Sequence, residues 1–169
     1  MAMVIRALTV DDEQEALLAQ GELADGDFPF LLEDTPGQTW ERYVGRLEEV
    51  RRGIDLAPDR VAATFLVGEV DRHLVGRVSI RHQLNDYLAA YGGHIGYAVR
   101  PAHRRRGYAS ALLRHGLVVT RQLGISRALV TCDVGNEASE RTITGCGGML
   151  EDVVEMPDGK GARARYWIG

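Results

Sequence analysis

The stretch from Gly92 to Ala109, GGHIGYAVRPAHRRRGYA, combines a short apolar segment, an arginine-rich loop and the start of a helix. Ile95–Val99 is apolar and β-prone, which predicts a strand. Pro101 ends this strand, because proline has no N–H for a ladder and keeps the preceding residue extended. Apolar residues then recur with helical spacing from Ala109 to Leu123, and Gly124 follows as a typical helix-ending residue.

The loop between strand and helix has the pattern Arg104-x-x-Gly107-x-Ala109. A helix start leaves backbone N–H groups without partners and carries partial positive charge, so it can bind a phosphate group. Gly107 lets the backbone approach phosphate oxygens, and Ala109 keeps the next contact small. Arg104, Arg105 and Arg106 add forked cationic donors. The alternative is a solvated basic turn before an ordinary amphipathic helix, but the strand ahead of the loop favours phosphate binding.

The segment resembles the acyl-CoA-binding core of the GNAT N-acetyltransferases, whose signature is Arg/Gln-x-x-Gly-x-Gly/Ala after a strand. The resemblance implies an enzyme that uses acetyl-CoA as co-substrate and moves the acetyl group directly to a primary amine. In such enzymes the backbone near Ala98 and Val99 pairs with the pantetheine arm and donates to the thioester oxygen. The residues expected to bind the cofactor are Ala98, Val99, Arg104, Arg105, Arg106, Gly107, Tyr108, Ala109, Asn136 and Ser139. A non-catalytic acyl-CoA-binding module is the second hypothesis.

The rest of the chain supports one α/β domain over residues 1–169 with a mixed central sheet. The resemblance implies a GNAT-like three-layer arrangement around a mostly antiparallel sheet that is splayed at the cofactor site. The order is β-α-α-β-β-β-α-β-α-β-β, which matches the GNAT order. Strands are expected at 4–8, 61–70, 74–81, 95–99, 128–134, 149–156 and 162–168, and helices at about 10–20, 40–52, 109–123 and 138–144. Trp40 and Tyr43 are expected in the core, with an acceptor pocket as the alternative.

Two residues are candidates for the general base. His94 stands where many family members carry glutamate, and histidine exchanges protons near neutral pH. The alternative for His94 is a half-buried histidine bonded to a backbone carbonyl. Asp133, at the end of the next strand, is the second candidate, and His82 is the third. The family often places a tyrosine seven residues after the equivalent of Asn136, where it protonates the departing thiolate. Here that position is Ile143.

Two further residues have alternative roles. Asn136 resembles the family's asparagine that meets the pantetheine amides, but asparagine is also a good helix cap, and the two roles can coexist. Cys132 could in principle be acetylated first in a two-step route, although nothing near it in sequence indicates an activated thiolate.

The composition argues against several kinds of binding partner. A net charge of −4 over 169 residues argues against general nucleic-acid binding. Cys132 and Cys146 lack Cys-x-x-Cys spacing, so no metal site is expected. Neither a signal peptide nor a membrane-spanning segment is indicated, so we expect no membrane association and a cytoplasmic enzyme, with a homodimer as a further expectation. The amine acceptor stays open: a small polyamine, an antibiotic, an amino acid, or a protein N-terminus or lysine.

Overall fold

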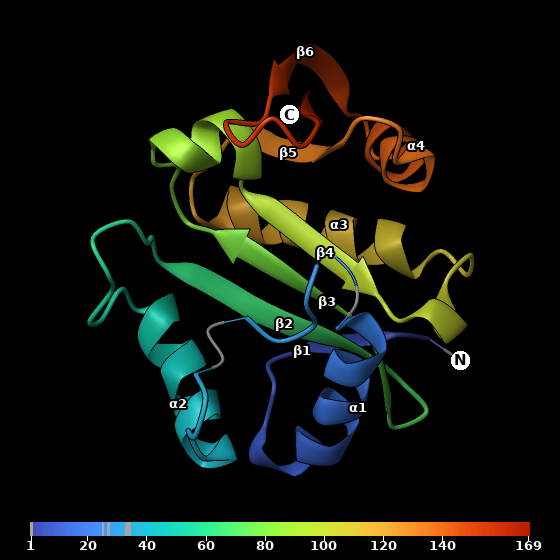
Figure 1. Cartoon of the computed structure of the whole chain (residues 1–169). Helices are drawn as coiled ribbons and strands as arrows, with labels where there is room; N and C mark the ends of the chain where they lie inside the picture. Colours follow the sequence, from blue (N-terminus) through green and yellow to red (C-terminus); the bar gives the residue numbers. More distant parts are fainter. Residues whose placement is uncertain (1, 25, 27, 33–34) are drawn as a thin grey trace.

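The strands form two antiparallel sheets in the computed structural model, which describes residues 2–24, 26, 28–32 and 35–169 (Figure 1). The first sheet has the order β1-β2-β3-β4 and the second has the order β5-β7-β6. Their bounds are Val4–Arg6 for β1, Ala63–Val70 for β2, His73–Arg81 for β3, Ile95–Val99 for β4, Ala128–Asp133 for β5, Met149–Glu155 for β6 and Ala162–Ile168 for β7.

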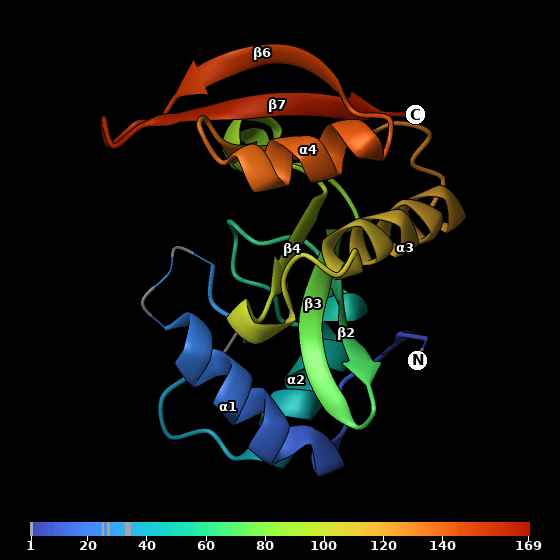
Figure 2. The same cartoon turned by 90° about the vertical axis from the view of Figure 1, so that its right-hand side faces the viewer.

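Helices cover both faces of the first sheet. Helices α1 (Glu13–Leu23) and α2 (Trp40–Arg51) lie on one face, and α3 (Tyr108–Gln122) lies on the other (Figure 2). Helix α4 (Glu137–Gly145) contacts β5 and α3. Three single turns complete the chain: 3-10 turns at Val10–Asp12 and Pro101–His103, and a π-helical turn at Leu88–Gly92.

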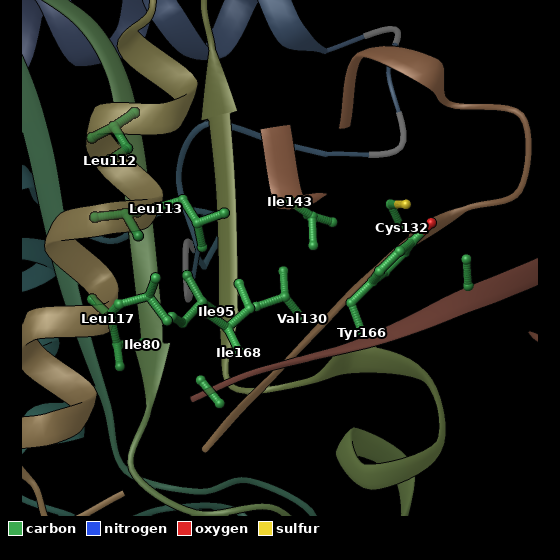
Figure 3. Close-up of a cluster of buried hydrophobic side chains, with 13 residues drawn as sticks. Ile80, Ile95, Leu112, Leu113, Leu117, Val130, Cys132, Ile143, Tyr166 and Ile168 are labelled. Carbon is green, nitrogen blue, oxygen red and sulfur yellow. The ribbon is translucent and has the colours of Figure 1, made fainter. Parts of the chain in front are cut away.

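Two clusters of buried apolar side chains hold these layers together. One lies between α3, the first sheet and the second sheet, and includes Ile80, Ile95, Leu112, Leu113, Val130 and Ile168 (Figure 3). The other lies under α1 and α2, where the rings of Trp40 and Tyr43 stack with centroids 5.2 Å apart. Both rings are buried there, which confirms the core prediction for this pair over the acceptor pocket.

The structure confirms the expected element order and the α/β class. A capping box precedes the first helix: the Thr9 N–H donates to Asp12 Oδ2 over 2.7 Å. The turn between β2 and β3 is tighter than expected, with Asp71 and Arg72 both at positive φ, as in the type I′ turns that suit hairpins. The π-helical turn at Leu88–Gly92 was not anticipated from the sequence.

The expected splay lies between β4 and β5, and it begins at His94. The His94 N–H donates to Leu129 O over 2.7 Å, and the Leu129 N–H donates to His94 Nδ1 over 2.9 Å. Gly93, at φ 68°, permits this approach, since a Cβ there would lie 2.6 Å from Leu129 O. Among the described residues no strand pairing continues between β4 and β5, so the two sheets diverge from this point.

Candidate active site

The first of two large cavities, of about 750 Å³, opens where β4 and β5 diverge beside the start of α3 and α4. It brings together most of the residues expected to bind the cofactor, although they come from three separate stretches of the chain. Its wall includes Ala98, Val99, Arg104, Arg105, Gly107, Tyr108, Ala109, Asn136 and Ser139. Of the expected set, Arg106 is not in this wall.

The start of α3 fits an anionic group. Its N-cap is Gly107, at φ 82°, which supplies no capping side chain, and the first turn holds no acidic residue. The side chains of Thr39 and Asn136, in contrast, cap α2 and α4. The Ala111 N–H donates to Gly107 O over 3.1 Å, so the N–H groups at 108–110 precede the helical ladder. These groups and the partial positive charge of the helix start suit a phosphate of CoA.

The register of β4 with β3 determines which peptide groups of β4 face the gap between β4 and β5. The Arg81 N–H donates to His94 O over 2.7 Å and the Arg100 N–H donates to Val75 O over 2.9 Å. Even-numbered residues of β4 therefore direct their peptide groups to β3, and Tyr97 and Val99 direct theirs to the gap. Ala98 lines the cavity, but its peptide groups pair with β3. Near Ala98, the N–H groups that can donate into the gap are therefore those of Tyr97 and Val99.

A second cavity, of about 810 Å³, lies on the other side of β4 and meets the first one. The residues common to both walls are Phe28, Ile95, Gly96 and Thr131. Arg77 and Arg81 of β3 and Arg163 of β7 also line the second cavity. Sequence reasoning missed this group. The available signal was the pair of arginines at 77 and 81, which lie on one face of an otherwise apolar strand.

A family model described as "Acetyltransferase (GNAT) family" matches residues 22–147. The chain belongs to the GNAT family. It is therefore an acetyltransferase that uses acetyl-CoA as co-substrate, as expected from the Arg104-x-x-Gly107-x-Ala109 loop. No curated protein sequence matches the chain.

Solved structures share the GNAT fold over almost the whole chain. The ribosomal-protein-S5-alanine acetyltransferase of Vibrio fischeri has a TM-score of 0.74 at 15% identity, with 99% of this chain and 93% of that chain covered. The putative acetyltransferase yncA of Salmonella typhimurium, solved with acetyl-CoA, has a TM-score of 0.65 at 17% identity, covering 99% and 94%. The microcin C7 self-immunity acetyltransferase MccE, solved with acetyl-CoA and AMP, has a TM-score of 0.68 at 15% identity, covering 98% and 91%.

The usual GNAT tyrosine position, Ile143, is fully buried in the core (Figure 3). A different tyrosine reaches the cavity from β4. The hydroxyl of Tyr97 lies 2.8 Å from Ser139 Oγ on α4, and both residues line the first cavity. Burial raises the pKa of Tyr97 to about 12, so its phenol stays protonated and can donate a hydrogen bond. Sequence reasoning missed Tyr97, since a tyrosine in an apolar strand reads as a core residue.

The structure places neither candidate base in the wall of either cavity. His94 is 6% exposed and its Nδ1 accepts the Leu129 N–H, so the geometry favours the structural alternative, with a backbone N–H rather than a carbonyl as its partner. Asp133 forms an ion pair of 2.9 Å with Arg163. The third candidate, His82, lies 2.8 Å from the Thr64 hydroxyl and also lines neither cavity.

Asn136 acts as a helix cap, because its Oδ1 accepts the Ser139 N–H over 3.1 Å. It also lines the cavity, so the capping and cofactor roles are compatible. Cys132 lines the same cavity, but burial and the nearby Glu140 raise the pKa of its thiol to about 11. The thiol is therefore protonated near neutral pH and is a poor nucleophile for a two-step route.

The described part of the chain offers no helix that is both long and apolar enough to span a membrane. Within the same residues, no group of three or more His, Cys, Asp or Glu side chains is placed to hold a metal ion.

Proposed function

We propose that this GNAT enzyme transfers the acetyl group directly from acetyl-CoA to a primary amine, at the point where the two cavities meet. The observation that supports this most is the common wall at Ile95 and Gly96, which gives the two reactants separate approaches to one position. The uncapped start of α3 supports CoA binding in the first cavity, and the amine approaches through the second. Acetyl-CoA in the solved structures of yncA and MccE is consistent with this assignment.

The proposed site supplies groups for attack at the thioester and for departure of the sulfur. The amine nitrogen attacks the thioester carbonyl carbon, and one N–H group on the gap side of β4, at Tyr97 or Val99, donates to the oxygen as negative charge develops. The carbon–sulfur bond then breaks, and the Tyr97 hydroxyl donates a hydrogen bond to the departing sulfur of CoA. We assign no side-chain base, because His94 and Asp133 lie outside both cavity walls, and the amine loses its proton to water.

Release of CoA thiol tests this function, with the protein mixed with acetyl-CoA and a panel of primary amines. We expect amine-dependent thiol release and an acetylated product by mass spectrometry. A second candidate function is a non-catalytic acyl-CoA-binding module, which is favoured by the position of His94 and Asp133 outside both cavity walls. Binding of acetyl-CoA without thiol release for any amine would support that module. The cytoplasmic location and the homodimer stay predictions.

Acetyl-CoA is expected to raise the melting temperature, because a ligand that binds only the folded state stabilises it. At ten times its Kd the gain is about 1.4 kcal/mol. The basis is the uncapped, cationic start of α3 at Gly107. Scanning fluorimetry over a range of acetyl-CoA concentrations measures the shift, and an unchanged melting temperature at millimolar cofactor would contradict the assignment of the first cavity.

Replacing Gly107 with valine is expected to weaken CoA binding about tenfold, as the left-handed backbone at φ 82° costs a branched residue about 1–2 kcal/mol. The strain distorts the loop that presents the N–H groups at 108–110. No protein atom lies within 4 Å of the new Cβ position, so the space beside it is open to cofactor. Isothermal titration calorimetry with CoA measures the affinity.

Gly124→Val is the matched control for this variant. Gly124 follows the other end of α3, also at φ 82° with no atom within 4 Å of a Cβ, and it lines neither cavity. Both variants are expected to lose similar stability, but only Gly107→Val should lose CoA affinity. Equal CoA affinity in the two variants would count against phosphate binding at the start of α3.

A further inference from the structure

The second cavity contains one buried and one half-buried arginine, Arg77 and Arg81, on one face of β3. Arg77, Ser79 and Arg81 alternate with core residues along the strand, so all three side chains lie on the same face. Ser79 is paired with Gly96 on β4. A Cβ built on Gly96 would lie 3.3 Å from Arg81 Nη1 and 3.8 Å from Arg77 Nη1. Both guanidinium groups therefore converge over Gly96, where the two cavities meet.

Neither arginine has a carboxylate partner among residues 2–24, 26, 28–32 and 35–169. Arg77 is only 3% exposed; its Nη2 donates to Pro29 O over 2.7 Å, and its Nε has no hydrogen-bond partner. Arg81 Nη1 lies 3.4 Å from Gly92 O and 3.5 Å from Gly93 O, at the limit of hydrogen bonding. Two cations are thus held close together with much of their donor capacity unused.

Arg100 is another buried arginine, and its contacts differ from those of Arg77. Arg100 is 7% exposed, but it forms ion pairs with Glu15 over 2.9 Å and with Glu22 over 2.6 Å. Those carboxylates raise the pKa of Arg100. Burial and the neighbouring charge of Arg81 instead lower the pKa of Arg77 to about 10. A buried cation without an anion is unfavourable, and a bound anion would remove that cost.

The cavity wall also contains groups of opposite charge, but they do not neutralise this pair. Asp59 and Asp86 are exposed, and within the described chain neither forms an ion pair with Arg77 or Arg81. Arg60 also lines this cavity, and Arg163 adds a further cation, which is partly compensated by Asp133. An acceptor that carried only ammonium groups would therefore meet like charges near the reacting position.

We propose that the acceptor is a small amine that also carries a carboxylate, an amino acid, and that Arg77 and Arg81 bind this carboxylate over Gly96. This inference rests on the proposed acetyl transfer. The forked donors of arginine match the two oxygens of a carboxylate. The peptide groups that face the thioester, at Tyr97 and Val99, lie about 3–10 Å farther along β4 at 3.3 Å per residue. That separation suits an amine and a carboxylate within one small molecule.

Paired substrates test the proposal: the twenty common L-amino acids and the C-terminal amides of the same amino acids, with spermidine as a purely cationic amine. The amides keep the amine and lose the carboxylate. We expect kcat/KM for the best amino acid to exceed that of its amide by about 10- to 100-fold, the range for hydrogen bonds to a charged group. Equal values for acid and amide, or faster turnover of spermidine, would overturn the proposal.

Arg77→Met and Arg81→Met are expected to reduce this acid-to-amide ratio towards one while CoA affinity stays unchanged. Arg51→Met, on the exposed face of α2, is the matched control and should keep the ratio. If a methionine variant does not fold, Arg77→Lys is used instead. Lysine keeps the charge but lacks the paired guanidinium donors, so it should lower the acid-to-amide ratio partially. A ratio that is unchanged in folded Arg77 and Arg81 variants would show that these arginines are only structural.

A binding measurement separates this proposal from the proposed acetyl transfer. With CoA present, the melting temperature is compared in the best-shifting amino acid and in its amide. A larger shift with the acid in the wild type, lost in Arg77→Met, supports the carboxylate site even if no thiol is released. Equal shifts would overturn it. Aminomethylphosphonate is compared with glycine in the same assay, and a preference for the phosphonate would overturn the carboxylate assignment.

Discussion

Tyr97→Phe is expected to lower kcat by about 10- to 100-fold and to leave acetyl-CoA affinity nearly unchanged. The substitution removes one hydroxyl, which lies 2.8 Å from Ser139 Oγ in the wall of the first cavity. A hydrogen bond to a group that becomes charged contributes about 1.5–3 kcal/mol, and the departing sulfur is such a group. The ring stays in place in phenylalanine, so packing against the core is preserved. Steady-state kinetics with the best acceptor and calorimetry with CoA measure the two quantities.

Two variants make this result specific. Ser139→Ala removes the partner of Tyr97 and leaves the phenol, so it should lower kcat less than Tyr97→Phe does. Tyr166→Phe alters another buried tyrosine that lines neither cavity and should keep the wild-type kcat. If Tyr97→Phe retained full turnover, the departing thiolate would be protonated by solvent and Tyr97 would serve only packing.

The loop that we propose binds phosphate, and most of the fold, could be predicted because they depend on short-range patterns. Pro101 ends a strand, Gly107 and Gly124 bound a helix, and the apolar periodicity between them sets its face. All of this information lies in one continuous stretch of the chain, from Ile95 to Gly124. The N–H groups at the start of α3 lack partners that an anion can supply, so the same segment also predicts an anionic ligand.

The catalytic details could not be predicted in the same way, because they depend on long-range register. Whether Ala98 or Tyr97 directs its peptide groups to the gap is decided by the pairing of β4 with β3. The convergence of Arg77 and Arg81 over Gly96 depends on the same pairing, since the arginines belong to one strand and the glycine to the other. The local sequence shows which residues of a strand share a face, but it does not show which residues of the neighbouring strand they pair with.

His94 shows how one side chain can be assigned two roles from sequence. Its position before β4 suggested a base near the incoming amine. In the structure its Nδ1 occupies the place of a backbone acceptor, taking the Leu129 N–H where a continuous ladder would supply a carbonyl. This bond joins β4 to β5 at the closed end of the splay. His94 therefore positions the gap without lining it.

His94→Ala is expected to lower the free energy of unfolding by about 1–3 kcal/mol, because it leaves the buried Leu129 N–H without an acceptor. His94→Asn is the matched control, since its Oδ1 can accept the same N–H and should lose less stability. Denaturant unfolding of the three proteins measures the difference. A general base would instead contribute roughly 10²- to 10⁴-fold to turnover. A loss of that size in both variants, with unchanged stability, would restore His94 as the base.

The same histidine gives a pH dependence with a definite sign. Burial, and then the charge of Arg81, lower the pKa of His94 below its usual 6.5, so the folded protein holds this ring neutral. At pH values above 6.5 the ring is neutral in both states, and the stability is fully present. As the pH falls through 6.5 towards the folded value, the unfolded chain binds the proton first and stability is lost.

The stability of His94→Asn should therefore fall less steeply than that of the wild type between about pH 7 and pH 5. The pKa values of His82 and His103 are also lowered, but they contribute equally to both proteins and cancel in the difference. Parallel slopes for the two proteins would mean that His94 exchanges its proton freely with solvent, as a histidine beside the acceptor amine would. The slope thus distinguishes a ring that joins β4 to β5 from one that takes part in the transfer.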